Sequence, residues 1–171
     1  LRHGNAFGIL YATYLDNEGF RRFSVSHELG HYHLPGHPES LLRDGPHTSY
    51  AGFFSKDRYE LEADHFAAGL LMPGFLFDSA MDKVTSGLDA IEALSDQCVT
   101  SRTATAIRYA QRTPDAVAIV VSAGQMIDYC FMSDSFRDIP GLDWLRKGSP
   151  LPHSSVTHSF NSDTANIARG E

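Results

Sequence analysis

The segment Ser24-Val25-Ser26-His27-Glu28-Leu29-Gly30-His31-Tyr32-His33-Leu34 is the strongest indication of fold and chemistry in the chain. It contains the pattern His-Glu-x-x-His. On an α-helix, His27 and His31 lie one turn apart on one face, with Cβ atoms about 5–6 Å apart, so both imidazoles can bind one metal ion. Glu28 is then held beside the metal without being a ligand, where a general base for an attacking water is needed. The segment therefore predicts the centre of a zinc peptidase.

The composition is that of an ordinary globular protein. The 171 residues are 42% hydrophobic and 11% aromatic, enough for one core with or without a small appendage. The net charge is −7 and no Lys- or Arg-rich block occurs, so we expect no direct binding to nucleic acid or to a membrane. Cys98 and Cys130 match no metal or redox spacing, which predicts reduced thiols in a cytoplasmic protein. Because the first residue is Leu1, we expect the sequence to begin inside a longer chain.

Hydrophobic patterning and turn residues predict helices and strands in a mixed order. Ser24 is the expected N-cap of the motif helix, and Pro35-Gly36 is its expected end. The tail from Arg137 is rich in Pro, Ser and Gly, and we expect only part of it to be ordered. The predicted elements are a β-hairpin of 7–15 and 20–23, a helix over 25–34, a loop over 35–57 leading into a short strand, helices over 59–72, 75–83, 88–98 and 101–111, and a β-hairpin of 115–122 and 126–132.

A peptidase of this type needs a third protein ligand, and three residues compete for that role. His37 continues the metzincin spacing, but Leu34 stands where that pattern has Gly. Glu60, in the next predicted helix, has Asp64 one turn further on the same face, where Asp64 can accept the second ring N–H of a ligand histidine. Glu62 lies about 200° round the helix from Glu60 and cannot share that face. We favour Glu60, with His37 and Glu62 as alternatives.

Two segments together carry a family resemblance. Residues 23–31 read Phe-Ser-Val-Ser-His-Glu-Leu-Gly-His, and residues 59–73 read Tyr-Glu-Leu-Glu-Ala-Asp-His-Phe-Ala-Ala-Gly-Leu-Leu-Met-Pro. This pairing resembles the ImmA/IrrE family of metallopeptidases, whose second motif reads Glu-x-x-Ala-Asn/Asp-x-Phe-Ala-Ala-x-Leu-Leu-Met-Pro. The resemblance implies His27, His31 and Glu60 as zinc ligands, Glu28 as catalytic base and Asp64 as partner of a ligand histidine.

Together, the elements and the resemblance predict an α+β fold. We expect a mainly helical, zincin-like catalytic core with an N-terminal β-hairpin, followed by a helical hairpin and a C-terminal β-hairpin region. The catalytic domain is placed at residues 1–112 and the small β-containing region at 113–171. The helices over 88–98 and 101–111 are superficially similar to a helix-turn-helix, but the negative net charge favours packing helices.

The resemblance further implies a cytoplasmic zinc endopeptidase that cleaves a helix-turn-helix repressor in stress or mobile-element control. Mn²⁺ is an alternative to Zn²⁺, because histidine and carboxylate ligands suit both ions. Candidates for stabilising the oxyanion or binding substrate are His47, Tyr50 and His65. Two other functions stay open: a non-catalytic zinc-binding regulatory or scaffold protein, and a zinc hydrolase of a non-peptide substrate.

Overall fold

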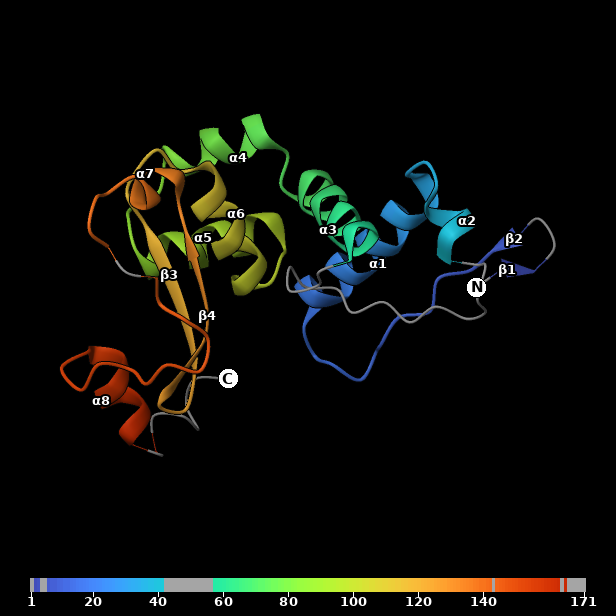
Figure 1. Ribbon diagram of the computed structural model, residues 1–171. Helices are drawn as coiled ribbons and strands as arrows, with labels where there is room; N and C mark the ends of the chain where they lie inside the picture. The colour runs from blue at the N-terminus through green and yellow to red at the C-terminus, as the bar shows by residue number, and fades with distance from the viewer. Residues whose placement is uncertain (1, 4–5, 42–56, 143, 164, 166–171) are drawn as a thin grey trace. The chain divides into compact units, whose positions relative to one another are not determined.

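The computed structural model describes every residue except 1, 4–5, 42–56, 143, 164 and 166–171. The fold is α+β and mainly helical, as predicted, and the chain divides into two compact units, residues 1–109 and 110–171. The elements, labelled in Figure 1, are β1 (Arg2–His3), β2 (Ala6–Phe7), α1 (Glu18–His33), α2 (His37–Leu41), α3 (Arg58–Leu71), α4 (Gly74–Met81), α5 (Leu88–Cys98), α6 (Arg102–Arg112), β3 (Ala118–Ala123), β4 (Met126–Met132), α7 (Asp134–Arg137) and α8 (Val156–Ser162).

Helix α1 begins seven residues earlier than predicted, so the strand over 20–23 and the Ser24 cap are wrong. The helix starts after Asn17, whose side-chain oxygen accepts a hydrogen bond from the Phe20 N–H at 2.8 Å. This cap, with helical burial spacing along the segment, outweighs the β-propensity of its aromatic residues. The N-terminal hairpin is instead formed by the antiparallel pair β1 and β2. The buried residues of α1 are Gly19, Phe23, Ser26, His27, Gly30 and His31.

Helices α1 and α3 pack side by side in the first unit (Figure 1). Helix α3 has nearly the predicted bounds, and the side chain of Asp57 caps it by accepting from the Tyr59 N–H at 2.8 Å. The backbones approach closely at Gly30, where a Cβ atom would lie 3.1 Å from Cα of Ala63. The close approach brings the histidine face of α1 against the acidic face of α3.

The core of the first unit combines side chains from α1, α3, α4, α5 and α6. The Thr100 and Thr105 hydroxyls bond to each other at 2.7 Å, and the Arg108 guanidinium donates twice to the Met72 carbonyl, at 3.0 and 3.2 Å. The first bond links the turn of the predicted helical hairpin to α6, and the Arg108 bonds fasten α6 to the end of α3. The buried core residues are Phe23, Ala67, Ala68, Met72, Phe77, Ala80, Leu94 and Ala104.

The second unit is built on the predicted β3–β4 hairpin, which is antiparallel with Ala118 opposite Met132. Its turn contains Gly124 at φ +57°. Val121 lies opposite Tyr129 and Ser122 lies opposite Ile127, so Asp128 is the extra residue of a bulge in β4. Within the predicted tail, α8 is joined to the hairpin turn by the Gln125 side-chain amide, which donates to the carbonyl of His158 at 3.2 Å.

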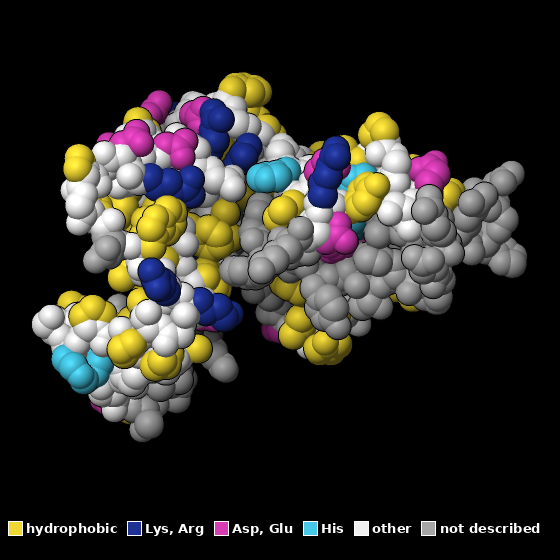
Figure 2. All heavy atoms as spheres, viewed as in Figure 1, with side chains coloured by type: hydrophobic (Ala, Val, Ile, Leu, Met, Phe, Trp, Pro, Cys, Tyr) yellow, Lys and Arg dark blue, Asp and Glu magenta, His cyan; other side chains and the backbone are white. Residues whose placement is uncertain are grey.

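The surface drawn in Figure 2 mixes charges and apolar groups. On this face several of the Lys and Arg side chains lie beside Asp and Glu side chains. Within the part of the chain that the structure describes, no helix is both long and apolar enough to cross a membrane.

Candidate metal centre

Three buried side chains from α1 and α3 bring possible metal-ligand atoms together. His27, His31 and Glu60 place one such atom each within 4.8 Å of the others. The two Nε2 atoms are 2.9 Å apart, and each lies 3.3 Å from an oxygen of Glu60. Helix α1 contributes both histidines because they are one turn apart, and α3 contributes the carboxylate from its first turn. The predicted ligand set is therefore close in space.

The other ring nitrogen of His27 contacts Asp64. The distance from Nδ1 to Oδ1 is 2.8 Å, and both side chains are almost completely buried. Burial lowers the pKa of His27, but the hydrogen bond to Asp64 and the negative charges of Asp64, Glu60 and Glu28 together raise it above its ordinary value. Asp64 thus lies where it can hold the ring of His27 with Nε2 facing Glu60.

The other ring nitrogen of His31 contacts His37, which the sequence presented as an alternative ligand. The two Nδ1 atoms are 3.0 Å apart, and Nε2 of His37 lies 3.0 Å from Oε2 of Glu62. The hydrogen bond from Arg58 holds the pKa of the Glu62 carboxyl below its ordinary value, and His37 adds to this effect. His37 and Glu62 therefore lie behind His31, on the side away from Glu60. The Pro35-Gly36 turn returns the chain toward α1, although the sequence predicted this turn only as the end of the motif helix.

The donor set fits a small divalent cation. A tetrahedral zinc ion with ligands at about 2.0–2.1 Å keeps its ligand atoms about 3.3 Å apart, close to the observed separations of 2.9 and 3.3 Å. With Nδ1 engaged elsewhere, each histidine can direct an Nε2 lone pair at the same point as the Glu60 carboxylate. The two Nε2 atoms and the Glu60 carboxylate are all electron-rich and buried, and a cation bound between them would stabilise this arrangement.

The remaining predicted residues fall into two groups. Glu28 follows His27 in α1 and is half-buried, and its negative charge is one of the causes that raise the pKa of His27. His65 is exposed on α3, and the structure does not bring it into the ligand group. His47 and Tyr50, with the short strand predicted around them, lie outside the described residues.

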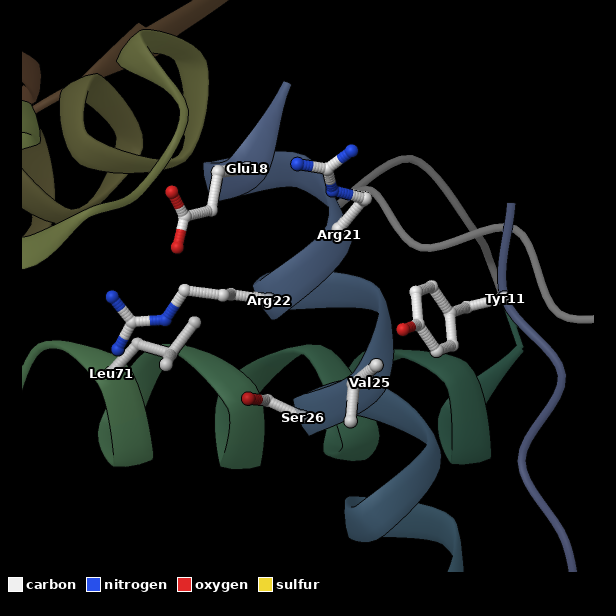
Figure 3. A pocket seen from close by; sticks show the side chains of 7 residues that line it. All are labelled: Tyr11, Glu18, Arg21, Arg22, Val25, Ser26 and Leu71. Carbon is white, nitrogen blue, oxygen red and sulfur yellow. The ribbon is translucent and has the colours of Figure 1, made fainter. Parts of the chain in front are cut away.

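A separate open pocket of about 510 Å³ lies beside the first half of α1 (Figure 3). Glu18, Arg22 and Leu71 lie on one side of the helix, and Tyr11, from the segment before α1, lies on the other. The Arg22 guanidinium donates to the carbonyls of Cys98 and Val99 at 3.3 and 3.4 Å, so this cation serves packing. The lining contains none of the three candidate ligands.

Comparison with known proteins identifies one family and one relative. The Peptidase M78 family model, described as an IrrE N-terminal-like domain, matches residues 2–90, just over half of the chain. The chain is also similar to an uncharacterized immunity region protein 2 of Bacillus phage phi105, with 42% identity over 60 residues. That match covers 35% of this chain and 35% of the length of the phage protein. The family match spans every residue of the candidate metal centre.

Proposed function

Because the chain belongs to the Peptidase M78 family of IrrE N-terminal-like domains, we propose that it is a zinc-dependent endopeptidase. The observation that carries this proposal is the convergence of His27, His31 and Glu60, with Glu28 next to the first ligand. A bound zinc ion supplies Lewis-acid chemistry that activates water and polarises a peptide carbonyl. Mn²⁺ is the alternative ion for the same ligands.

In this proposal, the side chains around the centre have separate tasks. Glu28 takes a proton from the attacking water and delivers it to the leaving amine. Glu28 is half-buried, so part of the residue remains accessible. Asp64 holds the ring of His27 by accepting its Nδ1 hydrogen, which keeps the lone pair of Nε2 directed at the cation.

The proposed substrate is a protein, and specifically a helix-turn-helix repressor. The support is the family resemblance of the two motifs together with a relative whose name places it in a phage immunity region. We also propose a cytoplasmic location, where thiols stay reduced; Cys98 and Cys130 are both free in the structure. Cleavage is tested on repressors encoded beside this protein's gene, each co-expressed with it and followed by mass spectrometry.

The decisive variant for catalysis is Glu28→Gln, which keeps the shape of the side chain and removes the base. We expect its zinc content to equal that of the wild type, while cleavage of the co-expressed repressor falls by about 10²–10⁴-fold. Equal cleavage by Glu28→Gln and wild type would contradict the enzyme proposal and favour a regulatory or scaffold protein. Intact repressors together with turnover of a non-peptide ester or amide would indicate the other hydrolase class.

The decisive comparison for the ligand set is Glu60→Ala against Glu62→Ala. Glu60→Ala removes one of the three converging donors, so we expect it to lose its zinc during dialysis. Glu62→Ala leaves all three donors in place and removes only a contact behind His31, so it should retain more zinc than Glu60→Ala after the same dialysis, with zinc measured by inductively coupled plasma spectrometry. Undiminished zinc in Glu60→Ala would reject this ligand assignment.

A further inference from the structure

A chain of hydrogen-bonding groups runs from the protein surface to His31. Arg58, an exposed residue at the start of α3, donates from Nε to Oε1 of Glu62 at 2.6 Å. The other oxygen of Glu62 lies 3.0 Å from Nε2 of His37, and Nδ1 of His37 lies 3.0 Å from Nδ1 of His31. His37 is completely buried. A buried imidazole is thus placed between a carboxylate and a candidate metal ligand.

The positions of the hydrogens follow from the geometry. Nε2 of His31 faces His27 and Glu60, so as a metal ligand it must present a lone pair. A neutral imidazole carries one hydrogen, which then resides on Nδ1 of His31 and is donated to Nδ1 of His37. The single hydrogen of His37 is therefore on Nε2, where it meets the carboxylate of Glu62. Each donor in this arrangement has an acceptor.

The local backbone holds His37 in this place. Gly36 has φ +85°, which lets the chain turn back directly after α1 ends. The N–H of His37 donates to the carbonyl of Leu34 at 3.3 Å, and helix α2 begins at His37. The ring of Tyr59 packs edge-on against the His37 ring, with centroids 4.8 Å apart. The backbone turn and the Tyr59 ring therefore hold the His37 imidazole in place without a bound metal.

We propose that His37 is a positioning residue for the metal ligand His31, and that Glu62 orients His37 in turn. The two ligand histidines are then held differently: His27 by a carboxylate directly, and His31 by a carboxylate acting through a second imidazole. The inference rests on the metal site of the proposed function, and it concerns zinc binding rather than peptide hydrolysis. Groups that hold a ligand histidine typically contribute about 10- to 100-fold to metal affinity.

The first test measures zinc affinity by competition with a chelator. His37→Leu fills the buried space without an acceptor, and we expect an affinity about 10- to 100-fold lower than that of the wild type. His37→Asn places an amide oxygen near the position of Nδ1 and should recover part of the loss. The matched control is His33→Leu, which removes an exposed histidine of α1 and should leave the affinity unchanged. Wild-type affinity in His37→Leu would overturn the proposal.

The second test needs no variant, so it decides the question even if His37→Leu fails to fold. Long-range ¹H–¹⁵N spectra of zinc-loaded wild-type protein with ¹⁵N-labelled histidine report which nitrogen carries each hydrogen. We expect His31 with its hydrogen on Nδ1 and His37 with its hydrogen on Nε2. A hydrogen on Nδ1 of His37 would overturn the proposal, because that atom could not accept from His31.

The outcomes separate this inference from the proposed function. Wild-type protein that binds no zinc would overturn both. Zinc binding and repressor cleavage in the wild type, with unchanged affinity in His37→Leu, would overturn only the role of His37. Lowered affinity in His37→Leu with no cleavage by any protein form would support the role of His37 and contradict the peptidase proposal.

Discussion

At the scale of single residues, the environment of His27 links metal binding to pH. Asp64 contributes one oxygen to the hydrogen bond with Nδ1, while its buried Oδ2 atom has no hydrogen-bond partner among the described residues. The hydrogen bond to Asp64 and the negative charge of Asp64 both act to raise the pKa of His27. In the absence of metal, this charge favours a second proton on His27.

The metal-free protein should therefore lose stability as pH rises. An imidazole in an unfolded chain titrates at about 6.5, and the pKa of His27 in the folded protein is raised above that value. The stabilisation from this group is fully present below about pH 6.5 and is lost as pH rises through the folded pKa. Zinc and the second proton compete for His27. The additional stability that zinc confers should therefore grow as pH rises through the pKa of His27. Urea unfolding of metal-free and zinc-loaded protein at a series of pH values around the pKa of His27 measures the free energy of unfolding of each form.

Asp64→Asn is the control for this pH dependence, because it removes the charge and retains an oxygen acceptor. The free energy of unfolding of the metal-free variant should fall less steeply with pH than that of the wild type. A wild-type curve that is flat, or that rises above pH 6.5, would contradict the assigned role of Asp64.

Residue spacing predicted which pairs of side chains share a helix face, but not how His37 contacts His31. Helical periodicity alone places His27 beside His31 and Glu60 beside Asp64, since each pair is four residues apart on one helix. The contact between His37 and His31 depends on a turn at positive φ and on how α2 returns toward α1. That three-dimensional return has no period in the sequence, so His37 could be identified as a candidate but not placed.

At the scale of elements, the start of α1 shows where local propensity misleads. The aromatic run before the motif predicted a strand, but Gly19 and Phe23 are buried one helical turn apart. Gly19 lies so close to the α5–α6 turn that a Cβ atom would come within 2.3 Å of the carbonyl carbon of Thr100. The close contact with a distant turn favours the helix in addition to the Asn17 cap, and a window of local sequence does not contain that contact. By contrast, α3, α5 and the β3–β4 hairpin rest on local signals and lie near their predicted bounds.

The contact between Gly19 and Thr100 predicts opposite effects for two glycine substitutions. In a helix, Gly→Ala normally stabilises by about 0.5–1 kcal/mol. At Gly69, in α3, nothing lies within 4 Å of the added carbon, so Gly69→Ala should show this gain. Gly19→Ala should instead destabilise, because forcing backbone atoms apart costs about 1–3 kcal/mol. Urea unfolding of both metal-free variants gives the comparison, and a stabilised Gly19→Ala would show that α1 does not pack on this turn.

At the scale of the whole molecule, the chemistry and the large core lie in the same part of the chain. The candidate ligands and the residues that support them occupy α1, the start of α2 and α3. The core cluster extends from Phe23 to Ala104. In residues 113–171, by contrast, the described buried hydrophobic side chains are Ile127, Met132 and Leu151. The metal centre and the core that supports it thus belong to the first unit.

This asymmetry predicts how the two proposed domains behave when separated after Arg112. A fragment of residues 1–112 keeps α6 whole, and with it the bonds from Arg108 to the Met72 carbonyl at the end of α3. We expect this fragment to fold and to bind one zinc ion with the affinity of the full chain. Residues 113–171 should not fold alone, because a segment of about 60 residues with so few buried apolar side chains is marginal at best. Circular dichroism measures whether each fragment folds, and chelator competition measures whether it binds zinc. An unfolded 1–112 fragment would show that the metal centre needs the C-terminal residues.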